Sequence, residues 1–416
     1  MRDILFQGAT LLRGAGDSMP RTGVDLLVRD GVIAPPDPTP DAQVIDARHL
    51  LLLPAFVNAH THSPEALARG RAPMARLDEW LLAQYAGGQD ALPAARIRHA
   101  ILVSAAEAIR GGAVSVTDHF RQIPPSVEAL RAASDAWAEA GIRARVALML
   151  RDLPAPGATF VPPSTEAALA VARAALAARP MAGEIGLGPS APQRCSDALL
   201  RGLADLARDH GAFLHLHLCE TAKDAADCRA RFGTDPVAHL GQLGLLGPHV
   251  DLAHCVHLVD AELDQLAATG TRMVHNPLAN LRLGSGIAPV GRALARGVRL
   301  GIGSDGPGSN DTQDMLEAAK LALLLPRAGR PDAEWPTAAQ ILDMATDGAA
   351  LAPGAVADLI AFDLRGAAFI ETTATELAPR LLMAARPRDL VHVMAAGAFL
   401  MRDRMLTSAT LSAVAP

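Results

Sequence analysis

The middle of the chain repeats one pattern, in which a short apolar run bounded by turn residues precedes a longer segment with helical periodicity. The helical candidates include residues 93–112, 165–179 and 196–211, the last with Ser196 as N-cap and Gly211 just past its end. The eight apolar runs, each expected to form a strand, are 51–58, 113–118, 143–150, 183–188, 212–218, 250–255, 271–276 and 298–305. Eight such units in succession predict an α/β fold with a closed, parallel (β/α)8 barrel of the TIM type.

The two ends of the chain have a different pattern of hydrophobic and turn residues from the middle. A strand pair with an Asp30-Gly31 turn is expected near the N-terminus, and strand-like runs with a Gly-containing turn recur over 356–402. Because neither end is long enough to bury a core alone, they are expected to assemble one small β-sandwich. The predicted domains are therefore 1–53 with 354–416 as the composite β-sandwich, and 54–353 as the barrel.

Composition narrows the class of partner. The 416 residues are 50% hydrophobic, with a net charge of −6 and a pI near 6.2, so there is no basic field for nucleic acid or anionic lipid. No apolar segment approaches the ~20 residues that span a bilayer, and the N-terminus lacks the apolar core of a signal peptide. We expect a cytoplasmic protein that takes a small-molecule substrate, binds neither nucleic acid nor membrane, and forms a homo-oligomer.

Cysteine usage removes one kind of metal chemistry, and lysine is scarce. The four cysteines form no C-x-x-C pair, which fits reduced thiols and excludes the zinc site of cytidine-type deaminases. Only two lysines occur, Lys223 in an expected loop and Lys320 in an expected helix.

Polar side chains close most of the expected strands. In a parallel barrel the catalytic groups lie at the C-terminal strand ends, so these residues are expected around one mouth. Two histidines spaced two apart face the same side of a strand, and three imidazoles with a carboxylate suit zinc or a similar divalent ion. The residues concerned are His60, His62, Asp118, His119, His217, Glu220, His254, His275, Asn276 and Asp305.

A histidine pair alone is a weak signal, and spacing leaves one choice open. His215 shares a face with His217, so the spacing cannot say which of the two is the ligand. Four other histidines lie in helical or loop patterns and are expected to be solvated: His99, His210, His239 and His249. The prediction of a metal site rests instead on the number of possible ligands that end strands of the same barrel.

Five segments give a more specific resemblance. "VNAHTH", "HLHLCET", "AHCVHL", "HNPLANLRLGSGIAP" and "GIGSDGPGSNDTQDM" resemble successive signature blocks of the amidohydrolase superfamily. The branch is the one that holds S-adenosylhomocysteine and methylthioadenosine deaminases, guanine deaminase and triazine hydrolases. The similarity covers nearly the whole chain and implies a (β/α)8 barrel with an appended β-sandwich.

The resemblance also implies roles for single residues. It makes His60, His62, His217 and Asp305 the metal ligands, which selects His217 over His215. It makes Glu220 the proton-shuttling acid and gives His254 a hydrogen bond to the attacking water or to the tetrahedral centre. Since no lysine can bridge two ions, a single divalent ion is expected, zinc first, with iron or manganese as alternatives.

Three departures from the family pattern stand out. Pro54-Ala55 replaces the usual Pro-Gly, and the junction near Leu351 is abbreviated, but neither touches the expected metal site. The third is "GPSAPQRCSD", where Ser190 and Gln193 replace a histidine and an aromatic residue common in nucleoside deaminases. This departure argues against a substrate of the adenosine type.

The expected activity is hydrolysis of a carbon-nitrogen bond other than a peptide bond. A metal ion lowers the pKa of its water to about 7, Asp305 takes the proton, and Glu220 protonates a ring nitrogen so that ammonia leaves a purine, pterin, pyrimidine or triazine. The alternatives are a triazine chlorohydrolase or aminohydrolase, a cyclic-amide or N-acyl amide hydrolase, and a non-catalytic scaffold, against which every filled ligand position argues. Substrate contacts are expected from loop residues over the mouth: Glu65, Arg69, Trp80, His119, Gln193, Arg194, Asn280, Ser309 and Asn310.

Overall fold

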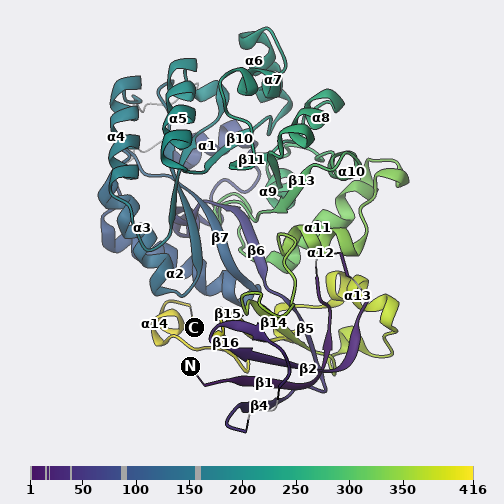
Figure 1. The fold of residues 1–416 in the computed structure, drawn as a ribbon. Coiled ribbons are helices and arrows are strands. Elements are labelled where there is room, and N and C mark those ends of the chain that lie inside the picture. Colours follow the sequence, from purple (N-terminus) through teal and green to yellow (C-terminus); the bar gives the residue numbers. More distant parts are fainter. Residues whose placement is uncertain are drawn as a thin grey trace.

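Eight parallel strands form a nearly closed barrel in the computed structural model, which describes residues 2–415 apart from 15, 18, 38–39, 86–90 and 155–160 (Figure 1). After the last strand, the amide of Asp305 donates a hydrogen bond of 2.9 Å to the carbonyl of His60, which brings the two ends of the sheet together. The predicted barrel is confirmed. Its strands are β6 (Phe56–Thr61), β7 (Ala113–Phe120), β8 (Arg143–Leu150), β9 (Glu184–Pro189), β10 (Leu214–Leu218), β11 (Val250–His254), β12 (Arg272–His275) and β13 (Arg299–Ile302).

Helices surround this barrel, and the three expected from periodicity are present. The Ser196 hydroxyl caps its helix by accepting a hydrogen bond from the Leu199 amide, and Gly211 ends it with a left-handed φ of 57°. The helices are α1 (Leu77–Tyr85), α2 (Ala94–Arg110), α3 (Val127–Glu139), α4 (Thr165–Ala177), α5 (Asp197–His210), α6 (Ala222–Phe232), α7 (Pro236–Gln242), α8 (Asp260–Thr269), α9 (Pro277–Arg282), α10 (Val290–Ala295), α11 (Met315–Leu324), α12 (Ala338–Ala345), α13 (Leu377–Ala384) and α14 (Ala409–Val414). Short 3₁₀ helices include η1 (Ser63–Ala68) and η2 (Pro192–Arg194). None of the described helices is long and apolar enough to cross a bilayer.

Both ends of the chain build a second, nine-stranded sheet. The N-terminal strands are β1 (Ile4–Leu11), β2 (Arg21–Arg29), β3 (Val32–Ala34), β4 (Gln43–Asp46) and β5 (Leu50–Pro54). The C-terminal strands are β14 (Leu359–Asp363), β15 (Leu390–Ala395), β16 (Ala398–Arg402) and β17 (Met405–Leu406). The antiparallel pairing of β5 with β14 joins the two groups, which confirms a small β domain made from both termini. The domain boundaries at 53/54 and 353/354 stay a prediction.

The first expected strand, residues 51–58, is not one strand. Its first half belongs to β5 in the small sheet and its second half to β6 in the barrel. Between them the Ala55 amide donates to the Asp358 carbonyl at 3.1 Å, so the chain changes partner there. An unbroken apolar run shows that a segment is buried, but it does not show which sheet the segment joins.

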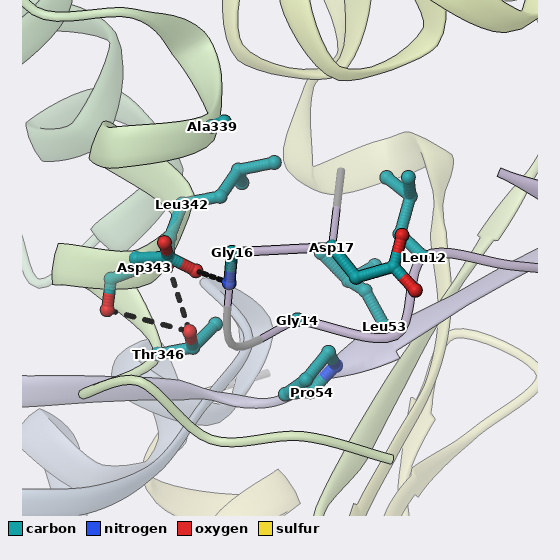
Figure 2. A pocket seen from close by; sticks show the side chains of 10 residues that line it. All are labelled: Leu12, Gly14, Gly16, Asp17, Leu53, Pro54, Ala339, Leu342, Asp343 and Thr346. Carbon is teal, nitrogen blue, oxygen red and sulfur yellow. Dashed lines mark hydrogen bonds between the residues drawn. The ribbon is translucent and has the colours of Figure 1, made fainter. Parts of the chain in front are cut away.

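A small pocket lies between the small sheet and helix α12 (Figure 2). Leu12, Leu53 and Pro54 line it from the small sheet, and Leu342 and Asp343 line it from α12. Because Pro54 comes just before β6, the pocket is on the amino-terminal side of the barrel strands. It is therefore a feature of the junction and not of the mouth where the polar strand ends gather.

His239 corrects one expectation about the histidines. It is 8% exposed, its ring stacks on Phe232 with centroids 3.9 Å apart, and its Nε2 lies 3.1 Å from Asp197 Oδ1. Since α7 packs against α6, this histidine is buried between outer helices and is not solvated. His99, His210 and His249 are exposed as expected.

Candidate metal centre and catalytic groups

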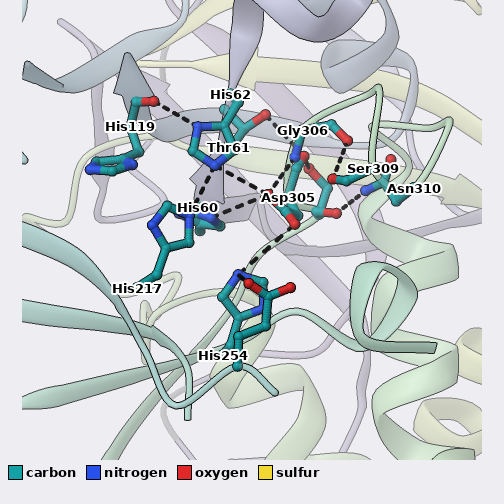
Figure 3. A network of polar contacts seen from close by, with 12 residues as sticks. His60, Thr61, His62, His119, His217, His254, Asp305, Gly306, Ser309 and Asn310 are labelled. Carbon is teal, nitrogen blue, oxygen red and sulfur yellow. Dashed lines mark hydrogen bonds and ion pairs between the residues drawn. The ribbon is translucent and has the colours of Figure 1, made fainter. Parts of the chain in front are cut away.

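Four side chains converge at the carboxyl ends of the barrel strands (Figure 3). His60 and His62 come from the end of β6, His217 from β10, and Asp305 from the segment after β13. The Nε2 atoms of His62 and His217 are 3.1 Å apart, and Asp305 Oδ1 lies 3.2 Å from His60 Nε2 and 3.5 Å from His62 Nε2. The structure thus brings together the four residues expected to bind a metal.

The charge states of this cluster fit a divalent cation. Burial, together with neighbouring imidazoles, holds the pKa values of His60 and His217 well below the ordinary value, so both rings are neutral. Burial alone would raise the pKa of Asp305, but His60, His254 and His62 hold it well below its usual range. The buried Nε2 of His60 has no hydrogen-bond partner among the described residues. His62 is the exception, because Glu65 and Asp305 raise its pKa against the effect of burial. Zinc and similar ions need neutral imidazoles and a carboxylate, so a bound ion would replace the second proton of His62.

Each imidazole of the cluster is held through its other nitrogen. His62 Nδ1 donates to the His119 carbonyl at 2.7 Å, and His217 Nδ1 donates to the Ser190 carbonyl at 2.6 Å. His60 Nδ1 lies 2.6 Å from His215 Nε2. His215 therefore contacts a member of the cluster from behind and does not join it. These bonds leave all three Nε2 atoms available as ligands.

Glu220 and His254 stand beside the cluster without belonging to it. His254 Nε2 lies 3.8 Å from Glu220 Oε2 and 3.9 Å from Asp305 Oδ2. Burial raises the pKa of Glu220 to about 7, although His254 works in the opposite direction. Near neutral pH Asp305 is thus anionic while much of Glu220 carries a proton. One carboxylate that accepts a proton and one carboxyl group that donates a proton are the pair that acid-base catalysis requires.

Two partners of these groups come from the "ANLRLGSG" segment. The Asn280 Oδ1 atom accepts a hydrogen bond of 2.8 Å from His254 Nδ1, so it turns the other ring nitrogen toward Glu220. The Ser285 hydroxyl donates to Glu220 Oε1 at 3.4 Å. Asn280 was expected to touch the substrate; its Oδ1 orients His254, while its buried Nδ2 has no hydrogen-bond partner among the described residues, so contact with the substrate stays a prediction. Ser285 was not singled out from the sequence, where a serine between two glycines reads as an ordinary turn.

Several residues expected to touch the substrate also form bonds within the chain. Gln193 Nε2 donates to Asp224 Oδ1 at 2.8 Å, and Arg69 forms a close ion pair with Glu107. Trp80 Nε1 donates to the Gly308 carbonyl at 3.1 Å, which fixes α1 over the mouth. The remaining bonds run within the loop after β13, where Ser309 Oγ donates to the Gly306 carbonyl at 2.9 Å and Asn310 donates to the Ser304 carbonyl. These contacts build the wall of the mouth, and direct contact with substrate stays a prediction for each residue.

His119, Glu65 and Arg194 lie nearer to the cluster. The buried ring of His119 has its centroid 4.8 Å from that of His217, and neither ring nitrogen has a hydrogen-bond partner among the described residues. Glu65 is 8% exposed and acts electrostatically on His62, and Arg194 acts in the same way on Glu220. All three stay candidates for contact with the substrate.

The two lysines play no part in this cluster. Lys223 in α6 pairs with Asp227, and Lys320 in α11 donates to the Met383 carbonyl. With no other lysine in the chain, a lysine-bridged pair of metal ions has no ligand to form on.

Comparison with known proteins agrees with this geometry. Residues 51–400 match the amidohydrolase family. A 5-methylthioadenosine/S-adenosylhomocysteine deaminase of Syntrophobacter fumaroxidans is 33% identical over 390 residues, which are 89% of this chain and 85% of that protein. The crystal structure of an adenosine deaminase from Xanthomonas campestris with bound zinc has a TM-score of 0.87 and 27% identity, and the match covers 99% and 96% of the two chains. The zinc complex of atrazine chlorohydrolase from Arthrobacter aurescens TC1 shares the fold, with a TM-score of 0.88 and 23% identity over 99% and 100% of the chains.

Proposed function

Because the chain belongs to the amidohydrolase family, we propose that it is a metal-dependent hydrolase that removes an amino group from a nitrogen heterocycle as ammonia. The observation that carries the proposal is Glu220, a buried carboxyl group with a pKa near 7 that stands beside the cluster. A hydrolase whose leaving group departs without a proton has no need of such an acid. The deaminase names of relatives that match most of the chain support the same reaction.

His60, His62, His217 and Asp305 would hold one divalent ion per chain, and zinc is the first choice because three imidazoles and one carboxylate suit it. A cation in this position supplies a water molecule acidic enough to act as a nucleophile near neutral pH. The zinc bound to the adenosine deaminase of similar fold supports the choice of metal. Iron or manganese are the alternatives to be distinguished by elemental analysis.

Different residues of the chain then carry out the separate proton transfers. Asp305, held anionic by its histidine neighbours, accepts a proton from the water. Glu220 delivers a proton to the ring nitrogen next to the carbon under attack, and His254 stabilises the negative charge that develops there. Because Asn280 fixes His254 through Nδ1, the other ring nitrogen points toward Glu220 and Asp305. The product is a carbonyl compound and ammonia.

Ser190 and Gln193 support a heterocycle that is not an adenosine-type nucleoside. Neither side chain is the histidine or the aromatic ring expected in nucleoside deaminases, and the Gln193 amide is bonded to Asp224. Because relatives are named as deaminases of adenosine derivatives, turnover of such nucleosides is the result that would contradict this part of the proposal. A cytoplasmic location, supported by four free buried cysteines, and assembly into a homo-oligomer complete the proposal.

Ammonia release over guanine, pterin, cytosine and aminotriazine compounds tests the activity, with 5'-deoxyadenosine and S-adenosylhomocysteine as nucleoside comparisons. Metal content per chain is measured on the same preparation. We expect one ion per chain and ammonia from at least one free heterocycle. Chloride release from a chlorotriazine, or ring opening of a cyclic amide, without ammonia from any amino compound would replace deamination by the corresponding hydrolysis. Full activity without bound metal would overturn the proposed centre.

A further inference from the structure

The three imidazoles of the proposed metal centre are not held in the same way. Main-chain carbonyls, which no substitution removes, accept the Nδ1 hydrogens of His62 and His217. His60 depends on a side chain instead, because its Nδ1 lies 2.6 Å from His215 Nε2. The orientation of one expected ligand is therefore set by a residue outside the expected set.

The proton positions on these two rings follow from their neighbours. With a divalent ion bound at His60 Nε2, the hydrogen of the neutral ring is on Nδ1 and points at His215. His215 Nε2 must then accept, which places the hydrogen of His215 on its own Nδ1. Asp251 Oδ2 lies 3.8 Å from that nitrogen, too far for a hydrogen bond but near enough for direct electrostatic attraction.

Asp251 is itself fixed by a buried ion cluster on neighbouring strands. Arg272 of β12 donates to both of its oxygens at 2.8 Å, and Arg145 of β8 donates to Oδ2 at 2.7 Å. Arg272 also donates to Asp347 at 3.0 Å. His215 is fully buried, and Asp251 and Arg272 are each 3% exposed. These contacts join His60 through the barrel interior to strands β8, β11 and β12.

Stability alone gives little reason for this arrangement. Taking charges out of water costs about as much as their pairing returns, and apolar residues of equal volume often serve a barrel interior as well. An acceptor for His60, held in one tautomer by the negative charge of Asp251 near its Nδ1, is a more specific reason. Carboxylate-histidine-metal arrangements orient ligands in this way.

We propose that His215 is a positioning residue, oriented by Asp251, which fixes the ring of His60 so that its Nε2 can bind a divalent ion. The proposal rests on the metal centre inferred above. It assigns the buried pair of His215 and Asp251 to metal affinity and not to contact with the substrate.

Two substitutions at His215 separate hydrogen bonding from packing. His215→Phe keeps the ring but has no acceptor, and we expect its zinc affinity, measured by competition with a chromophoric chelator, to fall roughly 10- to 100-fold. His215→Gln offers an amide oxygen near the position of Nε2, which can accept the hydrogen bond from His60. Its zinc affinity should therefore stay within about a few-fold of wild type. His239→Phe is the matched control, because it removes a buried, carboxylate-paired histidine from the outer helices, and it should leave zinc affinity unchanged.

Asp251→Asn tests the second link of the chain. If Asp251 acts through His215, this substitution weakens zinc binding in the wild-type background but not in the His215→Phe background. Circular dichroism on each variant restricts the comparison to folded protein. Equal losses in the Phe and Gln variants would assign the effect to packing, and unchanged affinity in His215→Phe would overturn the proposal. If the wild type itself binds no divalent ion, the failure belongs to the proposed metal centre and not to His215.

Discussion

Glu220 can be tested apart from metal binding by exchanging one atom of its side chain. Glu220→Gln keeps the shape but cannot donate a proton, so kcat should fall by roughly 10²–10⁴ while metal content stays at the wild-type level. Steady-state ammonia release and elemental analysis measure the two quantities on one preparation. If Glu220 only supported His217, zinc affinity would fall instead, roughly 10- to 100-fold, and added zinc would restore the rate. A metal-loaded Gln variant within a few-fold of wild type would favour dechlorination or amide hydrolysis.

The raised pKa of Glu220 gives a pH dependence with a definite sign. Because the acid form is the active one and burial raises its pKa to about 7, kcat should fall as pH rises through this value. The nearby cation favours the carboxylate and should move this limb toward lower pH. Measuring kcat between about pH 5 and 9 locates the limb, which should be absent from the residual rate of Glu220→Gln. A rate that keeps rising above pH 8 in the wild type would contradict this assignment.

The identities of Ser190 and Gln193 lead to a prediction about the substrate. Neither is the histidine or aromatic residue expected in nucleoside deaminases, and Gln193 is bonded to Asp224, so we expect a free heterocycle to be turned over and S-adenosylhomocysteine to be a poor substrate. The comparison uses kcat/KM for ammonia release. A value of about 10⁴–10⁸ M⁻¹s⁻¹ on S-adenosylhomocysteine, the range of enzymes on their own substrates, would show that these two residues do not exclude nucleosides.

At the scale of elements, the ends of the strands aim the catalytic groups. His254 and Asp305 have left-handed φ values of 71° and 65°, and Cys219, just before Glu220, has a φ of 47°. Non-glycine residues adopt this conformation uncommonly, and such backbone strain clusters at active sites. Each of these residues lies at the point where its strand stops and the site begins.

Gly303, the residue after β13, tests how closely the barrel must close. A methyl group there would lie 2.3 Å from Asn276 Oδ1 and 2.9 Å from the His60 amide, so β13 would be pushed away from β6. We expect Gly303→Ala to lose about 1–3 kcal/mol of folding free energy by overpacking and to bind zinc more weakly. Gly241→Ala in α7, where the nearest atom is Leu246 Cδ1 at 3.2 Å, is the control. Equal thermal unfolding and zinc affinity in both variants would show that the contact relaxes freely.

At the scale of the whole molecule, the proposed ion would join distant parts of the chain. His60, His217 and Asp305 come from β6, β10 and the segment after β13, so the ion would cross-link strands that separate on unfolding. Zinc at 100 times its dissociation constant should then stabilise the fold by about 2.7 kcal/mol. The thermal unfolding midpoint should rise with zinc and fall with chelator, whereas the His60→Ala variant should show little response. An equal response in that variant would place the stabilising ion elsewhere.

The amino-acid pattern was enough to predict the succession of strands and helices, the small β domain from both termini, and the set of polar residues that end strands. These follow from local rules, because periodicity, turn residues and the C-terminal ends of parallel strands are properties of short segments. Its resemblance to a known family selected His217 over His215, a choice that spacing could not make.

The contacts between segments became known only from the folded structure. It divided residues 51–58 between two sheets, buried His239 between outer helices, and turned Asn280 to His254. It also placed His215 behind His60 and joined it to Asp251 and Arg272, which read in the sequence as ordinary polar residues of strands. The physical reason is that the protonation, burial and orientation of a side chain depend on partners from other strands. A pattern within one strand does not specify which residues the closed barrel sets against it.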